Sequence, residues 1–261
     1  MSIIKKLYIE TSRGQVHGRI TARRLGLPVV LLHQTASSSA MYERLMAELA
    51  ADFWLVALDT PGFGQSFVPV ERPSTAFYAT ILWQALGQLD IGFCHLFGHH
   101  TGAAIAVQMA DAAPEQVGKL ILSGPPLLSQ ALIERLQAGL QPIMPDADGR
   151  FLTETWQRLR HKAPDAPLDL ILRETLLTIQ AGPSYPLAYE AVFDQPFAAQ
   201  LAGLSQPTLL LAGEQDSLHA CLQPAHALLP HSTLRSLPDA DGYLCDRQPE
   251  RVAAVLREFL C

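Results

Sequence analysis

Short apolar runs alternate with longer stretches of helical periodicity along the first 125 residues. Four runs rich in branched side chains read as buried strands, at residues 28–32, 53–58, 94–97 and 119–122. The stretches between them predict helices over 41–50, 74–89 and 103–112. Ahead of this alternation, strand patterns at 6–11 and 15–21 flank Gly14 and predict a hairpin. Strands alternating with helices are typical of a parallel sheet with helices on both faces.

The alternation stops between residues 126 and 200. Helical patterns at 127–140, 151–161 and 168–180 follow one another there without a strand, and prolines separate them. The strand–helix pattern then returns, with strands at 207–211 and 233–237 and helices near 219–229 and 249–260. For a chain of 261 residues we therefore expect one α/β core made of residues 1–125 and 201–261, with a helical cap over residues 126–200.

Composition narrows the class of protein. A hydrophobic fraction of 49% suits a well-filled core, and a net charge of -6 without a run of Lys or Arg argues against nucleic acid or an anionic membrane as partner. No CxxC spacing indicates a zinc site or a disulfide framework among the four cysteines, Cys94, Cys221, Cys245 and Cys261.

The chain also lacks the pattern of a signal peptide and any apolar stretch of roughly 20 residues that could span a bilayer. We therefore expect a cytoplasmic protein with a small-molecule substrate and no cofactor or metal, for which a homodimer is one conceivable assembly.

The most informative motif is Gly98-His99-His100-Thr101-Gly102, which joins a strand pattern to an Ala-rich helix pattern. A strand–turn–helix of this kind is the context of the nucleophile elbow Gly-x-Ser-x-Gly. Both glycines are present, but His100 stands where the reactive serine is expected.

Five motifs in order resemble the α/β-hydrolase superfamily over nearly the whole chain. They lie at residues 31–34, 58–66, 98–102, 209–216 and 238–250. The resemblance implies an α/β-hydrolase fold, with a mostly parallel central sheet flanked by helices and a helical cap insertion. The chain resembles an atypical member of that family, because His100 replaces the nucleophilic serine and the usual loop histidine is missing. Fold alone does not settle the chemistry.

Three positions depart from the pattern of that family. Gln34 follows His33 where a glycine is usual, His100 replaces the nucleophilic serine, and Gly242 stands at or near the place of the catalytic histidine. Only Asp216 keeps the residue type of its triad position. An acyl-serine intermediate is therefore not expected.

The changes at positions 100 and 242 are coupled in our interpretation. A glycine at 242 leaves space for an imidazole, and His100 supplies one from the opposite wall. We predict that His100 leans toward Asp216 and that the pair acts as a general base on water or on an acidic substrate proton. If the last loop aligns differently, His226 or His231 would be the base instead.

Other candidate residues surround this predicted pair. The backbone N–H of Thr101 would be one oxyanion donor at a helix start, and Gln34 or Thr35 the second, although the Gln34 side chain could equally block the pocket. We include His33 and Tyr243 among the substrate-binding candidates. For His33 we favour a role in bracing its loop, and Tyr243 would form a pocket wall or donate a hydrogen bond.

The resemblance implies an enzyme acting on a small, largely apolar carbonyl, ester or carboxylic-acid compound. Water-activated hydrolysis and lyase- or decarboxylase-type chemistry are both open to a His–Asp base. The alternative is a catalytically inactive relative that binds a small molecule. A third hypothesis is a metal-assisted hydrolase using His99 and His33, although these residues lack a recognised ligand spacing.

Overall fold

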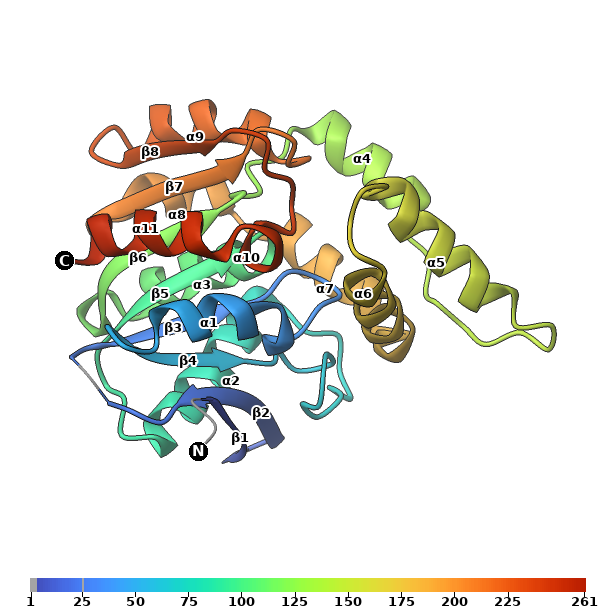
Figure 1. The fold of residues 1–261 in the computed structure, drawn as a ribbon, viewed down its shortest axis with the longest axis horizontal. Coiled ribbons are helices and arrows are strands. Elements are labelled where there is room, and N and C mark those ends of the chain that lie inside the picture. Colours follow the sequence, from blue (N-terminus) through green and yellow to red (C-terminus); the bar gives the residue numbers. More distant parts are fainter. Residues whose placement is uncertain (1–3, 25) are drawn as a thin grey trace.

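An eight-stranded sheet runs through the computed structural model, which describes residues 4–24 and 26–261 (Figure 1). In chain order the strands are β1 (Ile4–Thr11), β2 (Gly14–Thr21), β3 (Pro28–Leu32), β4 (Trp54–Leu58), β5 (Cys94–His99), β6 (Val117–Ser123), β7 (Thr208–Gly213) and β8 (Thr233–Leu237). Their order in the sheet is β1-β2-β4-β3-β5-β6-β7-β8. The pairs β1–β2 and β2–β4 are antiparallel and all others are parallel, so the predicted mostly parallel sheet is confirmed.

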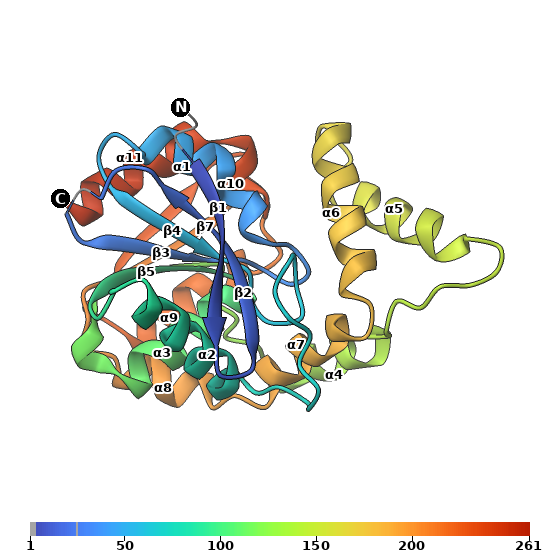
Figure 2. The same ribbon diagram turned by 90° about the horizontal axis from the view of Figure 1, so that it is seen from below.

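Helices cover both faces of this sheet (Figure 2). One face carries α1 (Glu43–Leu49), α10 (Leu244–Arg247) and α11 (Pro249–Leu260), and the other carries α2 (Thr75–Gln88), α3 (Thr101–Ala112), α8 (Phe197–Gly203) and α9 (Leu222–Leu228). The hydrophobic core accordingly consists of two clusters, one on each side of the sheet. Every residue of β3 and β4 is buried, because a strand covered on both faces is a continuous apolar run instead of an alternating one.

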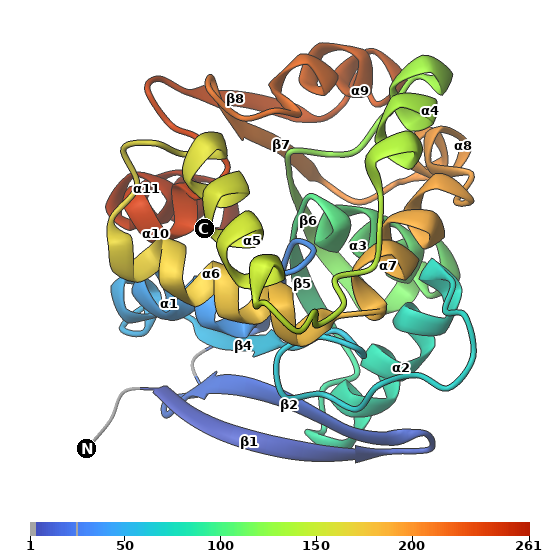
Figure 3. The ribbon, with the colours of Figure 1, turned by 90° about the vertical axis from the view of Figure 1, so that its right-hand side faces the viewer.

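The chain between β6 and β7 is helical. Its first four helices, α4 (Gln130–Gly139), α5 (Arg150–Lys162), α6 (Leu168–Ala181) and α7 (Ser184–Phe193), lie to one side of the sheet, where α5 and α6 stand apart from the core helices (Figures 1 and 3). The fifth helix, α8, instead packs beside α3. The division into a core and a cap at residues 126 and 200 stays a prediction.

Local differences from the predicted elements have identifiable causes. The helix expected over 41–50 is a 3₁₀ turn, Ser39–Tyr42, followed by α1, and the Ser38 side chain caps the turn by accepting from the Ala40 N–H. The sequence pattern missed α7 because Pro186 lies in its first turn, where a helix tolerates proline since no backbone N–H is needed there. None of the helices within 4–24 and 26–261 has the length and apolar character to span a membrane.

Candidate active site

One tight turn joins β5 to α3 and places His100 at its apex, with φ 50° and ψ −111°. The two glycines of the motif are there because neighbouring backbone approaches closely. A Cβ atom on Gly98 would lie 2.3 Å from the carbonyl oxygen of Gly102, and one on Gly102 would lie 2.0 Å from that of Leu32. A left-handed conformation at a non-glycine residue is strained, and such strain concentrates at functional sites.

His100 contacts Asp216, which follows β7 at the same end of the sheet. Nε2 of His100 lies 2.9 Å from Oδ1 and 2.8 Å from Oδ2 of the carboxylate. The Leu218 N–H also donates to Oδ1 at 2.8 Å. Burial would raise the pKa of Asp216, but the charge and hydrogen bond of His100 outweigh it and hold that pKa well below its usual range. The carboxylate is therefore ionised and can only accept hydrogen bonds.

Two glycines border the His100 ring, and only Gly124 lies so close that a Cβ atom would overlap it. A Cβ atom on Gly242 would lie 3.6 Å from Oδ2 of Asp216 and 3.7 Å from Cε1 of His100. On the other side, a Cβ atom on Gly124 would lie 2.4 Å from Cδ2 of the same ring. The imidazole thus lies beside Gly242, as expected from the paired changes at these positions. His226, the alternative base, instead bonds Ser232.

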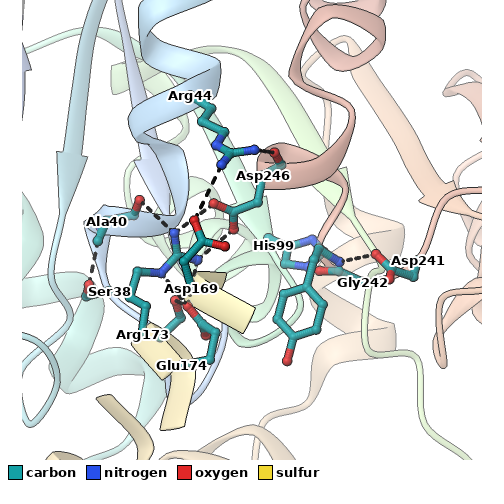
Figure 4. A network of polar contacts seen from close by, with 12 residues as sticks. Ser38, Ala40, Arg44, His99, Asp169, Arg173, Glu174, Asp241, Gly242 and Asp246 are labelled. Carbon is teal, nitrogen blue, oxygen red and sulfur yellow. Dashed lines mark hydrogen bonds and ion pairs between the residues drawn. The ribbon is translucent and has the colours of Figure 1, made fainter. Parts of the chain in front are cut away.

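His99 stacks against His100, with ring centroids 4.1 Å apart and an interplanar angle of 23°. Adjacent residues of such a turn are expected to point in different directions, and the stacked rings show that this expectation is wrong. His99 Nε2 lies 2.9 Å from the carbonyl oxygen of Gly242, which is labelled beside it in Figure 4. Nδ1 of His99 lies 2.8 Å from Ser123 Oγ. Burial, and then the charge of His100, lower the pKa of His99 to about 3, so the ring is neutral. Since a carbonyl only accepts, Nε2 carries the proton and Nδ1 accepts from the Ser123 hydroxyl.

These hydrogen bonds bear on the metal hypothesis. Among the described residues, His99, His100 and Asp216 have potential ligand atoms within 4.8 Å of one another, whereas His33 is not in the group. Both nitrogens of His99 are already engaged, and a ligand nitrogen cannot keep its proton. The donor set is therefore arranged for hydrogen bonding and does not fit a metal ion.

His33 connects two loops instead of facing a ligand. Its Nδ1 donates to the Gln34 carbonyl oxygen at 2.8 Å, and its Nε2 accepts from the Thr60 N–H at 2.9 Å. Burial lowers the pKa of His33, so the neutral ring can play both parts. This contact pattern is the loop-bracing role that we favoured, and His33 does not line the cavity described next.

A cavity of about 210 Å³ opens over His100. Four of the predicted site residues line it: Gln34, Thr35, His100 and Thr101. Tyr243 does not, because it is only 2% exposed and packs in a small apolar cluster with residues of the α5–α6 region. The sequence motifs did not identify the lining residues from α4, α5 and α7, because no motif fixes where an inserted helix lies. The remaining residues of the lining are Pro126, Leu128, Leu132, Arg135, Leu136, Lys162, Tyr189, Val192, Phe193, Ser217 and Leu218.

Thr35 and Thr101 form a hydroxyl pair on this wall. The Thr35 hydroxyl donates to Thr101 Oγ1 at 2.9 Å, and the Thr35 N–H points to the same oxygen at 3.4 Å. The Thr101 hydroxyl therefore keeps its own proton for another acceptor. Thr101 is also the first residue of α3, so its backbone N–H has no acceptor within the helix. Both groups are donors at the cavity wall.

Comparison with known proteins places this site in a family context. A 2-hydroxymuconate semialdehyde hydrolase of Pseudomonas sp. is 28% identical over 213 residues, 74% of this chain and 71% of that protein. A 2-(acetamidomethylene)succinate hydrolase of Mesorhizobium japonicum is 24% identical over 95% of this chain and 92% of its own length. An uncharacterized protein of Mycobacterium bovis is 36% identical over 110 residues, 41% of this chain but only 32% of that protein, so the match spans about a third of this relative.

Solved structures agree on the fold. The crystal structure of E-2-(acetamidomethylene)succinate hydrolase has a TM-score of 0.77 at 21% identity and covers 98% of this chain and 99% of its own. The bromoperoxidase from Bacillus anthracis has a TM-score of 0.81 at 20% identity, with coverage of 98% and 99%. The two curated relatives that match most of this chain, described above, are named as hydrolases. The model of the alpha/beta hydrolase fold family matches residues 28–246, and the chain therefore belongs to this family.

Proposed function

We propose that the protein is an enzyme in which His100 acts as a general base on a small carbonyl, ester or carboxylic-acid compound. The contact between His100 Nε2 and the ionised Asp216 carries this proposal. Because the carboxylate only accepts, Nε2 holds the proton of the neutral ring and Nδ1 keeps its lone pair. Nδ1 has no hydrogen bond to any residue within 4–24 and 26–261, and an unshared imidazole lone pair at a cavity is what a general base requires.

The assignment of the two nitrogens is the reverse of that in a Ser–His–Asp triad. There the Nδ1–H faces the aspartate and Nε2 receives the proton of the serine. Here the imidazole itself occupies the elbow, so the base acts directly on water or on an acidic proton of the substrate. Asp216 orients the ring and stabilises its cation, while the N–H and hydroxyl of Thr101 are placed to stabilise an oxyanion or enolate.

Hydrolysis by an activated water is the form of the reaction that we favour. Two relatives that match most of the chain are named as hydrolases of a semialdehyde and of a succinate derivative, both small carbonyl or carboxylate compounds. Proton abstraction from a substrate carbon would use the same atom of His100, and product analysis separates the two reactions. The cavity lining drawn from α4, α5 and α7 supports the proposal that residues 126–200 form a cap over this site.

Steady-state kinetics on small activated esters tests the proposal. His100→Ala should lower kcat by about 100-fold or more, the usual contribution of a general base. His219→Ala is the matched control, because His219 lies near Asp216 in the chain but bonds Ser236 and does not line the cavity. Product release should show no acyl-enzyme burst. Unchanged kcat in His100→Ala would refute the assignment, and ligand binding without any turnover would favour an inactive binding protein.

A further inference from the structure

The cavity over His100 carries positive charge and no negative charge. Arg135 of α4 and Lys162, the last residue of α5, line it, and none of the lining residues is Asp or Glu. The whole chain has a formal net charge of -6. The local charge of the cavity is therefore opposite to that of the molecule, and a cavity of this kind concentrates anions.

Neither cation is neutralised within the described residues. Arg135 has no ion pair there, and Lys162 has none either; its Nζ lies 5.4 Å from the centroid of the Tyr243 ring. A cation–π contact holds an ammonium group in place without cancelling its charge. The contact with the buried Tyr243 ring thus helps to position Lys162 at the cavity.

A second cleft nearby shows the opposite arrangement. Its arginines are paired with carboxylates (Figure 4). Arg173 donates to both carboxylate oxygens of Asp246 at 2.7 Å and also to Glu174. Arg44 lies 3.8 Å from Asp169. The arginine charges between α6 and the core are thus neutralised by carboxylates of the protein itself. Arg135 and Lys162, by contrast, have no carboxylate partner among the described residues, so their charge is available to a ligand.

The charge of the Lys162 ammonium also acts on His99, the neighbour of His100. Burial is the main cause of the lowered pKa of His99, followed by the charge of His100, and Lys162 adds to the same effect. His99 stacks on His100. Since Lys162 and His100 also line the same cavity, an anionic group bound at Lys162 would share that cavity with the base.

We propose that the cavity selects small substrates that carry a carboxylate, which Lys162 and Arg135 bind at its mouth. This inference rests on the proposed function of the same site. The hydrocarbon part of the substrate would contact the apolar wall of Leu128, Leu132 and Phe193. A volume of about 210 Å³ suits a short-chain acid.

Binding of hexanoate and hexanamide to the full chain tests the charge preference without any turnover. The two probes have nearly the same shape and differ in charge. We expect hexanoate to bind about tenfold more tightly, equivalent to 1.4 kcal/mol, and added salt to weaken hexanoate alone. Lys162→Gln should remove most of the preference and Lys162→Gln with Arg135→Gln all of it. Arg158→Gln is the matched control, since Arg158 is also exposed on α5, contacts the Tyr185 ring and does not line this cavity.

The outcomes separate this inference from the proposed function. Equal affinity for the two probes, no binding of either, or a preference that survives in the double variant would overturn the inference. His100→Ala should keep the preference for hexanoate, because its missing ring is not the anion site. If that variant instead kept full turnover while hexanoate was still preferred, the general base would be wrong and the carboxylate selection would stand.

Discussion

At the residue scale, the chemistry depends on which nitrogen of His100 carries the proton. The ionised Asp216 fixes it at Nε2. An amide at position 216 can donate to Nε2 instead, which moves the proton to Nδ1 and removes the base. Asp216→Asn should therefore lower kcat by about 100- to 10,000-fold with little change in substrate binding.

The matched control for that substitution is Glu214→Gln, an exposed acid at the end of the same strand. It should leave kcat unchanged. Measuring kcat and KM separately distinguishes loss of the base from loss of the pocket, since a distorted cavity would raise KM. An Asp216→Asn protein with the parental kcat would show that the tautomer of His100 is set by something other than the carboxylate.

The Thr101 hydroxyl is a second residue whose role can be tested by a graded pair of variants. Thr101→Ser keeps the hydroxyl that accepts from Thr35 and donates to the cavity, whereas Thr101→Val removes it at almost the same size. Loss of one oxyanion donor costs about 100-fold in kcat. We expect that loss in Thr101→Val and recovery of most of the rate in Thr101→Ser. Equal kcat values in the two variants would show that the Thr101 hydroxyl has no catalytic role.

At the scale of elements, the His100 ring lies beside Gly124 in the loop after β6 and Gly242 in the loop after β8. The two positions differ in whether they tolerate a Cβ atom. Gly124 has φ +56° and its Cβ position overlaps the His100 ring, while the Cβ position of Gly242 makes ordinary contacts. Gly124→Ala should displace the ring, lower kcat strongly and destabilise the fold by about 1–2 kcal/mol. Gly242→Ala should leave both nearly unchanged. Kinetics and chemical denaturation of the two variants check this, and similar losses in both would show that the ring does not depend on the Gly124 loop.

The elements themselves were largely predictable, for a physical reason. Central strands such as β3 and β4 are covered on both faces, so their sequences are unbroken apolar runs that stand out from any surroundings. The His100–Asp216 contact could be predicted because both residues follow strands whose carboxyl ends meet at one edge. The stacking of His99 could not, because it depends on hydrogen-bond partners far along the chain, the Ser123 hydroxyl at the end of β6 and the Gly242 carbonyl in the loop after β8.

The inserted helices mark the limit of sequence-based prediction at this scale. Helical periodicity located α4, α5 and α6 in the sequence, but it contains no information on how they pack over the core. For this reason Lys162 and Tyr189 were missed as cavity residues, and Tyr243 was assigned to a wall that it does not form.

At the scale of the whole molecule, a buried carboxylate ties the N-terminal hairpin to the core. Asp59 follows β4 and accepts hydrogen bonds from His17 Nδ1 at 2.8 Å, from the Ser39 N–H at 2.7 Å and from the Gln65 N–H at 2.9 Å. These contacts join β2, the turn before α1 and the loop after β4. An aspartate in this motif is expected to form a turn by accepting from backbone N–H groups, and the contacts of Asp59 with the Ser39 and Gln65 N–H groups are of that kind.

This carboxylate should make the stability of the protein sensitive to acid. Burial would raise the pKa of Asp59, but the hydrogen bond of His17 and the other donors lower it to about 2 from a usual 3.8. A lowered folded-state pKa stabilises the protein at pH above the unfolded value, and this contribution is lost as the pH falls from about 4 to 2. A difference of nearly two units corresponds to about 2 kcal/mol.

Denaturant unfolding at pH values from 7 to 2 measures this effect. Asp59→Asn should be less stable than the parent at pH 7 by about 2 kcal/mol and should lose less stability between pH 4 and 2. Asp216, whose pKa is also lowered, keeps some acid sensitivity in the variant. The exposed Asp165→Asn serves as control and should follow the parent at every pH. Parallel curves for Asp59→Asn and the parent below pH 4 would mean that acid unfolding begins elsewhere, because the linked proton would then not be bound at Asp59.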